Sequence, residues 1–162
     1  MKKGFIVVAA LVFSLVFSLY VAGPAAAASP KPPATACFTF SDEGYVFNFL
    51  LVTKAAGGTI AMKTTKYKAY SVTGALSIDG SNAVPIFGSA TAYTNTSGDN
   101  LFRFNVSGTV TSLALLNFSA RGNWNLTDQT GETYALVTST SGTLGFSGTL
   151  TMIPCDSFDF AP

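Results

Sequence analysis

The sequence predicts an all-β protein, an antiparallel meander of about 8–9 strands that closes into a small β-barrel, with a β-sandwich as the alternative. Three observations predict this fold class. Apolar and polar residues alternate with a period of two, which is typical of half-buried strands. Clusters of Gly, Asp, Asn and Ser separate the alternating segments where turns are needed. No stretch after residue 28 has the apolar spacing of an amphipathic helix.

The clearest alternation runs through three segments, in which one face is mainly apolar or small and the other carries Ser, Thr, Asn or Arg. These strands are predicted at 70–78, 116–126 and 144–152. Less regular strands are predicted at 37–41, 44–53, 59–64, 84–93, 101–110 and 133–139. Turn-forming residues connect them, among them Asp42-Glu43-Gly44, Ala56-Gly57-Gly58 and Asp79-Gly80.

Closure into a barrel is favoured because it leaves no exposed strand edge. Glycines also fall inside predicted strands, where a barrel needs bends and close backbone approaches. They are Gly74, Gly88, Gly108, Gly122 and Gly148. A transmembrane barrel, with its apolar faces on lipid, is an alternative. Several short strands and a chain that ends Phe160-Ala161-Pro162, without a final aromatic residue, favour apolar faces that point inward.

Residues 1–28 have the composition of a secretory signal peptide. Lys2 and Lys3 precede an apolar run over 5–22, and small residues follow it. A retained membrane anchor is the alternative, because about 18 apolar residues can just span a bilayer. We expect residues 29–36 to be a Pro-rich tether, 37–157 a single β-barrel domain and 158–162 a C-terminal tail, with no stable membrane span once the signal peptide is removed.

The two cysteines, Cys37 and Cys155, lie near the two ends of the predicted domain. In an oxidising compartment we expect them to form a disulfide with each other. A lipid-anchored Cys37 is the alternative, because the residues before it loosely resemble a lipoprotein cleavage box. The sequence thus predicts a secreted protein, extracellular, periplasmic or at the cell surface. Four Asn-x-Ser/Thr sequons, which a glycosylating pathway could use, begin at Asn95, Asn105, Asn117 and Asn125.

The composition excludes several function classes. The chain has no His, which excludes nucleophile systems that depend on His and any His-ligated metal site. Nine Lys+Arg against eight Asp+Glu leave no basic surplus for a nucleic acid. Because the carboxylates fall almost entirely in predicted turns or the tail, we expect no enzyme, no metal site and no cofactor. Arg103 or Arg121 facing an acidic residue is the arrangement that would favour an enzyme instead.

Aromatic residues on the predicted strands are the main indication of function. The residues predicted to line the barrel interior are Phe102, Phe104, Phe118, Trp124, Tyr134 and Phe146. Small residues on the same faces favour a pocket for one small ligand, and a fully packed core is the alternative. We therefore expect an exported, non-catalytic barrel that binds a small apolar or amphipathic ligand. The alternative is a structural or adhesive module of the cell envelope or surface, without a small-molecule ligand.

The segment Gly122-Asn123-Trp124 resembles the Gly-x-Trp motif of lipocalins and avidin-like proteins, which are small exported ligand-binding barrels. In those families the motif belongs to the first strand, whereas here it lies in the second half of the chain. The resemblance therefore covers three residues and implies an architecture, and no binding residue is carried over from it.

Overall fold

A computed structural model of the chain describes residues 30–62, 65–110 and 116–157. Its strands are β1 (Thr35–Asp42), β2 (Tyr45–Met62), β3 (Thr65–Ile78), β4 (Val84–Thr94), β5 (Asn100–Val110), β6 (Leu116–Asn125), β7 (Thr130–Ser139) and β8 (Gly142–Ile153), followed by a short 3-10 helix, η1 (Cys155–Ser157). The predicted signal peptide and C-terminal tail lie outside the described residues. Within the described ranges, no helix is long and apolar enough to cross a membrane.

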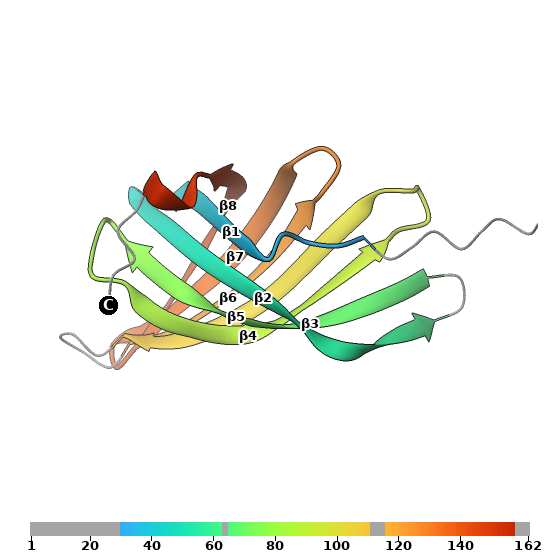
Figure 1. Ribbon diagram of the computed structural model, residues 1–162. Coiled ribbons are helices and arrows are strands. Elements are labelled where there is room, and N and C mark those ends of the chain that lie inside the picture. Colours follow the sequence, from blue (N-terminus) through green and yellow to red (C-terminus); the bar gives the residue numbers. More distant parts are fainter. Residues whose placement is uncertain (1–29, 63–64, 111–115, 158–162) are drawn as a thin grey trace, which may run out of the picture.

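The all-β prediction and the closed barrel are both confirmed. Each strand pairs antiparallel with the next, and β8 pairs with β1, so the hydrogen-bonded sheet forms a closed ring of eight strands (Figure 1). The strand order is the order of the sequence, which makes every connection a simple hairpin. This is the up-and-down arrangement that an alternating sequence with short turns predicts.

The eight strands fall within the predicted 8–9, but one predicted turn is wrong. Segments 44–53 and 59–64 were expected as two strands joined by a turn at Ala56-Gly57-Gly58, but they form the single strand β2. Its pairing with β3 shifts register between Ala55 and Thr59, and Gly57 and Gly58 have φ angles of 83° and 70°. The two glycines therefore form a bulge within a long strand, because such φ values can disturb one ladder without reversing the chain.

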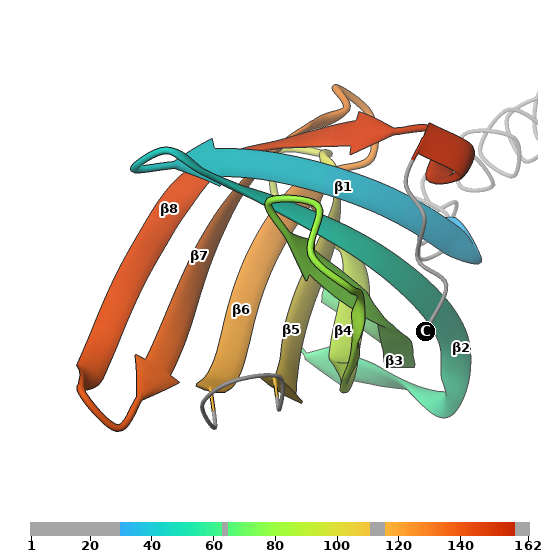
Figure 2. The same cartoon turned by 90° about the vertical axis from the view of Figure 1, so that its left-hand side faces the viewer.

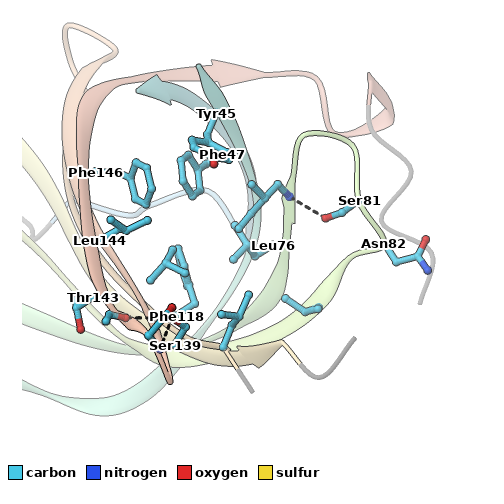
Figure 3. Close-up of a pocket in the computed structure, with 16 residues that line it drawn as sticks. Tyr45, Phe47, Leu76, Ser81, Asn82, Phe118, Ser139, Thr143, Leu144 and Phe146 are labelled. Carbon is cyan, nitrogen blue, oxygen red and sulfur yellow. Dashed lines mark hydrogen bonds between the residues drawn. The ribbon is translucent and has the colours of Figure 1, made fainter. Parts of the chain in front are cut away.

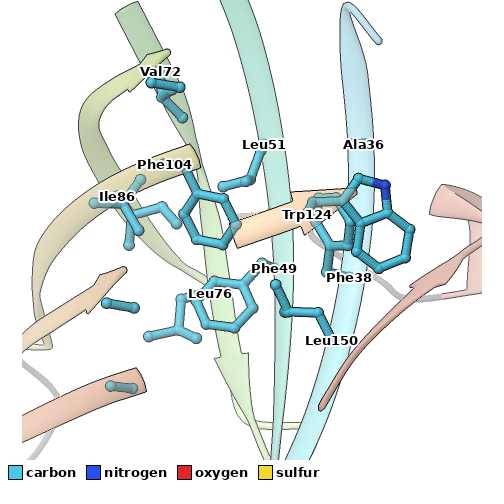
Figure 4. Close-up of a cluster of buried hydrophobic side chains, with 14 of the residues drawn as sticks. Ala36, Phe38, Phe49, Leu51, Val72, Leu76, Ile86, Phe104, Trp124 and Leu150 are labelled. Atoms are coloured by element: carbon cyan, nitrogen blue, oxygen red, sulfur yellow. The ribbon is translucent and has the colours of Figure 1, made fainter. Parts of the chain in front are cut away.

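Most large apolar side chains point into the barrel, and most polar ones point out. On β6 the inward residues Phe118, Ala120 and Trp124 are at most 2% exposed, whereas Asn117 and Arg121 on the opposite face are exposed. The inward residues of the strands together form one cluster of buried apolar side chains (Figure 4). This orientation is the reverse of a transmembrane barrel, which turns its apolar residues to lipid.

The seam between the first and last strands is the shortest pairing in the ring. Only Cys37, Phe38 and Thr39 pair with residues of β8. A disulfide between Cys37 and Cys155 joins one end of this seam, with the two Cα atoms 5.2 Å apart, and confirms the predicted pairing. Farther along, Asp42 Oδ2 accepts a hydrogen bond of 2.7 Å from the backbone N–H of Ser147 (Figure 2 shows β1 beside β8). The first and last strands are therefore held together by a disulfide on one side of a short ladder and by a hydrogen bond on the other.

The part of the predicted tether that the structure describes, residues 30–34, has no regular secondary structure. It nevertheless lies against β2, because Thr53 donates its backbone N–H to the carbonyl of Ala34 at 2.8 Å and its hydroxyl to that of Pro33 at 2.8 Å. Strand β1 begins at Thr35, two residues before the predicted start. The last residues of the tether thus extend the sheet.

Candidate functional site

The meander divides the connections between the two ends of the barrel. The β1–β2, β3–β4 and β7–β8 connections, the end of β5 and the start of β6 lie at one end, which we call the mouth. The start of β1 and the end of β8 lie at the other end, which we call the closed end. The two ends differ in how side chains fill them. This difference places the candidate site.

Aromatic rings fill the closed end. The indole of Trp124 on β6 packs edge-on against the ring of Phe38 on β1, with the ring centroids 5.0 Å apart. Phe38 also stacks on Phe104 of β5 at 6.1 Å. A Cβ atom added at Gly122 would overlap the ring of Phe104, so this glycine makes room for an aromatic ring (Figure 4). In this half of the barrel the small residues make room for neighbouring rings and do not leave a pocket. This half therefore has the fully packed core that was the alternative to a ligand pocket.

The mouth contains a cavity of about 600 Å³. Its wall comes from the ends of β2, β3, β4, β6, β7 and β8 and from two of the turns (Figure 3). The lining residues are Tyr45, Phe47, Leu76, Ile78, Ser81, Asn82, Val84, Leu116, Phe118, Val137, Ser139, Ser141, Gly142, Thr143, Leu144 and Phe146. A water molecule has about 30 Å³ in the liquid, so this volume corresponds to about twenty waters and lies within the usual range of ligand pockets.

Rings and branched aliphatic chains form the inner part of the cavity. The ring centroid of Phe47 lies 5.0 Å from that of Phe146 and 6.4 Å from that of Phe118. Phe47 also stacks nearly parallel on Phe40 at 4.5 Å, which anchors it to the aromatic cluster behind it. Because these three rings are at most 3% exposed and rest on packed neighbours, the apolar floor is preformed.

The outer part of the cavity is partly exposed and mixed in character. Tyr45 and Leu144 are 43% and 58% exposed, and the ring of Tyr45 meets that of Phe146 edge-on at 5.5 Å. Hydroxyl groups come from the turns: Ser81 Oγ accepts from the N–H of Ile78 at 3.2 Å. Within the described part of the chain, no lining residue carries a charge. The site therefore presents an apolar interior and a neutral polar rim.

The structure distributes the six predicted lining residues over three places. Phe118 and Phe146 line the cavity, and Phe102, Phe104 and Trp124 belong to the packed closed half. Tyr134 was expected on the inner face, but it is 40% exposed on the outer wall, where the guanidinium of Arg121 lies 5.3 Å from its ring centroid. On β7 the buried residues are Thr133 and Ala135, so the register of the alternation places Tyr134 outside.

Sequence reasoning missed Tyr45 and Phe47 as lining residues. The signal was available, because positions 45, 47, 49 and 51 alternate with polar or smaller residues along β2. What the alternation could not show is that the first two of these positions lie at the mouth and the last two in the packed interior.

Groups that could carry catalysis are dispersed. Arg103 and Arg121 are both exposed on the outer wall, and Arg103 Nε donates to Asn123 Oδ1 at 2.7 Å. Among the described residues, no three acidic or cysteine side chains gather as a metal site would require. Two buried side-chain atoms, Asn48 Oδ1 and Tyr70 Oη, have no hydrogen-bond partner in the described structure, and neither residue lines the cavity. Burial raises the pKa of Tyr70 above its usual value.

Two of the sequon asparagines have structural roles in turns. Asn95 Oδ1 accepts from the N–H groups of Ser97 and Asp99 at 2.9 and 2.8 Å, and its Nδ2 donates to Asp99 Oδ2 at 2.8 Å. Asn125 makes the corresponding contacts with Thr127 and Asp128 in the β6–β7 turn. The asparagines at these two positions therefore stabilise turns through their own side chains, which explains them without glycosylation.

Comparison with protein-family models, with curated proteins and with solved structures finds no match for this chain. The resemblance of Gly122-Asn123-Trp124 to the Gly-x-Trp motif stays a local one. In this barrel Trp124 belongs to β6 and closes the end opposite the cavity against Phe38.

Proposed function

We propose that this protein is an exported, non-catalytic barrel that binds one small apolar or amphipathic molecule in the cavity at its mouth. The observation that carries the proposal is the cavity itself, about 600 Å³ with a floor of Phe47, Phe118, Phe146 and Leu76. A hollow that opens to solvent at its rim and has a buried apolar floor has the form and size of a small-molecule pocket, which supports a ligand.

Physical chemistry supports an apolar ligand over a polar one. Water in the cavity would face aromatic and aliphatic carbon, which offers it no hydrogen bonds. An apolar ligand would bury its own surface and that of the floor, with a gain of about 25 cal/mol for each Å² removed from water. Because the floor rings are already held by neighbours such as Phe40, binding requires little ordering of side chains.

Export is supported by the disulfide. A bond between Cys37 and Cys155 closes a loop with a sequence separation of 118 residues. Such bonds persist in oxidising compartments and are rare in the cytosol. The composition of residues 1–28 favours the same interpretation, since a charged start, an apolar run and small residues form a signal peptide.

The test compares two tryptophan variants at neighbouring positions of β7. Val137 lines the cavity and Leu136 lies on the outer wall, so Val137→Trp places an indole in the cavity and Leu136→Trp places the same group outside it. We expect the uncharged dye N-phenyl-1-naphthylamine to gain fluorescence with wild type and Leu136→Trp, and to bind at least tenfold more weakly to Val137→Trp. No dye binding to folded wild type, or equal binding to both variants, would refute the proposal.

The structural or adhesive module is the second candidate. Large exposed apolar side chains on the outer wall would support it, and Phe87 on β4, 58% exposed, is the most prominent. The other exposed apolar residues of the wall are Val46 and Val52, six positions apart on β2, Tyr134 on β7 and Met152 on β8, and scattered apolar residues are normal on a monomer. Concentration-dependent self-association that Phe87→Ser abolishes would favour this function over the first.

A further inference from the structure

Charge is distributed unevenly between the two ends of the barrel. Three acidic residues lie at the mouth: Asp42 ends β1, Glu43 follows it in the β1–β2 turn, and Asp79 follows β3. No Lys or Arg lies in the described mouth turns. The described mouth turns therefore carry negative charge only.

The acidic groups are fixed beside the cavity. Asp79 Oδ1 accepts from the N–H of Val46 at 2.8 Å, and the N–H of Asp79 donates to the carbonyl of Val46 at 2.9 Å, next to the lining residue Tyr45. Asp42 pairs with Tyr45 across the β1–β2 hairpin and accepts from Ser147, which neighbours the lining residue Phe146. The carboxylates of Asp42 and Asp79 are thus held by residues that neighbour the cavity wall, and Glu43 lies two positions before the lining residue Tyr45.

The basic residues lie elsewhere. Lys31 precedes β1, and Lys54, Lys66 and Lys68 lie in the half of the β2–β3 hairpin that belongs to the closed end. Arg103 is near the start of β5, also toward the closed end, and Arg121 is on the outer wall. Neither the cavity lining nor the described mouth turns therefore supply a cation to an anionic group of a ligand.

We propose that the cavity selects amphiphiles whose head group is uncharged or positively charged, and excludes anionic ones of the same length. This inference rests on the proposed function and adds the ligand class. A carboxylate head seated at the mouth would lose part of its hydration without gaining a cation or a bidentate partner. It would also meet three like charges, whereas an alcohol head can exchange hydrogen bonds with hydroxyls such as that of Ser81. An ammonium head would be attracted by the same carboxylates.

The first test uses three ligands with one tail and three heads: decan-1-ol, decanoate and decylammonium, each competing with N-phenyl-1-naphthylamine at pH 7.5. We expect decanoate to bind about tenfold more weakly than the other two at low salt, which corresponds to about 1.4 kcal/mol. The difference should shrink at 0.5 M salt, because screening weakens charge repulsion at the exposed mouth. Decanoate binding as tightly as decan-1-ol would overturn the ligand class and leave the cavity function standing. Dye that never binds would overturn the proposed function itself.

The second test removes the mouth charges. Glu43→Gln/Asp79→Asn neutralises two mouth carboxylates and keeps an oxygen that can accept from Val46. Glu132→Gln/Asp128→Asn makes the same chemical changes toward the closed end, so it is the matched control. We expect the mouth variant to bind decanoate at least threefold more tightly than wild type, with decan-1-ol unchanged, and the control to bind both as wild type does. An equal effect of the two variants on decanoate, or none from either, would contradict the inference.

Discussion

Removing the disulfide is the sharpest test of how this barrel closes. The change is Cys37→Ala together with Cys155→Ala, which deletes the covalent link beside the β1–β8 seam. We expect the double variant to fold to the same barrel, because β1 keeps its full ladder with β2, from Thr35 paired with Val52 to Asp42 paired with Tyr45. The loss should therefore appear as a lower free energy of unfolding.

The magnitude follows from the loop that the disulfide closes. The two cysteines are separated by 118 residues in sequence. In the chain-entropy account, cross-linking a loop of this length restricts the unfolded chain by about 5 kcal/mol at 25 °C. A domain of this size has a total stability of about 5–15 kcal/mol, so the double variant should unfold at a much lower urea concentration. The short seam, with three residue pairs, offers little to offset the loss.

The assay is equilibrium urea unfolding followed by tryptophan fluorescence. Trp124 is the only tryptophan, is 1% exposed and packs against Phe38 of β1, so its emission reports directly on whether the first strand stays in the barrel. Below the unfolding transition, N-phenyl-1-naphthylamine should bind the variant as it binds wild type, because the disulfide lies at the closed end and the cavity at the mouth.

Two outcomes would refute this reasoning. A loss of less than about 1 kcal/mol, with the wild-type bond verified by mass spectrometry, would show that the unfolded chain is not restricted as the loop length implies. A loss of dye binding in a variant with native Trp124 emission would show that the closed end and the mouth are not independent.

Two further predictions concern the interior. Gly122→Ala should lower the free energy of unfolding by about 1–3 kcal/mol, since the new methyl group would overlap the ring of Phe104 and lie 3.0 Å from Leu150 Cδ1. Ser119→Ala on the outer face of the same strand is the control and should change the free energy of unfolding by less than about 0.5 kcal/mol. Tyr70→Phe should raise stability by about 1 kcal/mol at pH 7, because it removes a buried hydroxyl with no described partner. Burial raises the pKa of Tyr70 above its unfolded value of 10.0, so the unfolded chain loses this proton first and the free energy of unfolding of the wild type should fall as the pH rises above 10. Tyr70→Phe should lack this fall. Equal slopes of the free energy of unfolding against pH for the two proteins, between pH 9 and pH 11, would contradict this.

Much of the fold could be predicted because its determinants are local. The alternation through 116–126 shows which side chains share a face, and the structure confirms Phe118 and Trp124 on the inner one. Cysteines at both ends of the domain predicted the bond that joins β1 to the segment after β8. The error at Gly57 and Gly58 has a local cause as well, because a pair of glycines with positive φ serves a bulge as readily as a hairpin turn.

The sequence by itself therefore determined an all-β chain, the face that each side chain takes on most strands, the positions of most turns and the pairing of the cysteines. Only the tertiary structure decided where the interior is full and where it is empty. That depends on the summed volumes of side chains that meet at one level of the barrel from strands far apart in sequence. Phe104 fills the space over Gly122, whereas a cavity of about 600 Å³ remains at the mouth, with Phe146 in its lining. Alternation is a property of one strand, but this cavity depends on the side chains of six strands at once.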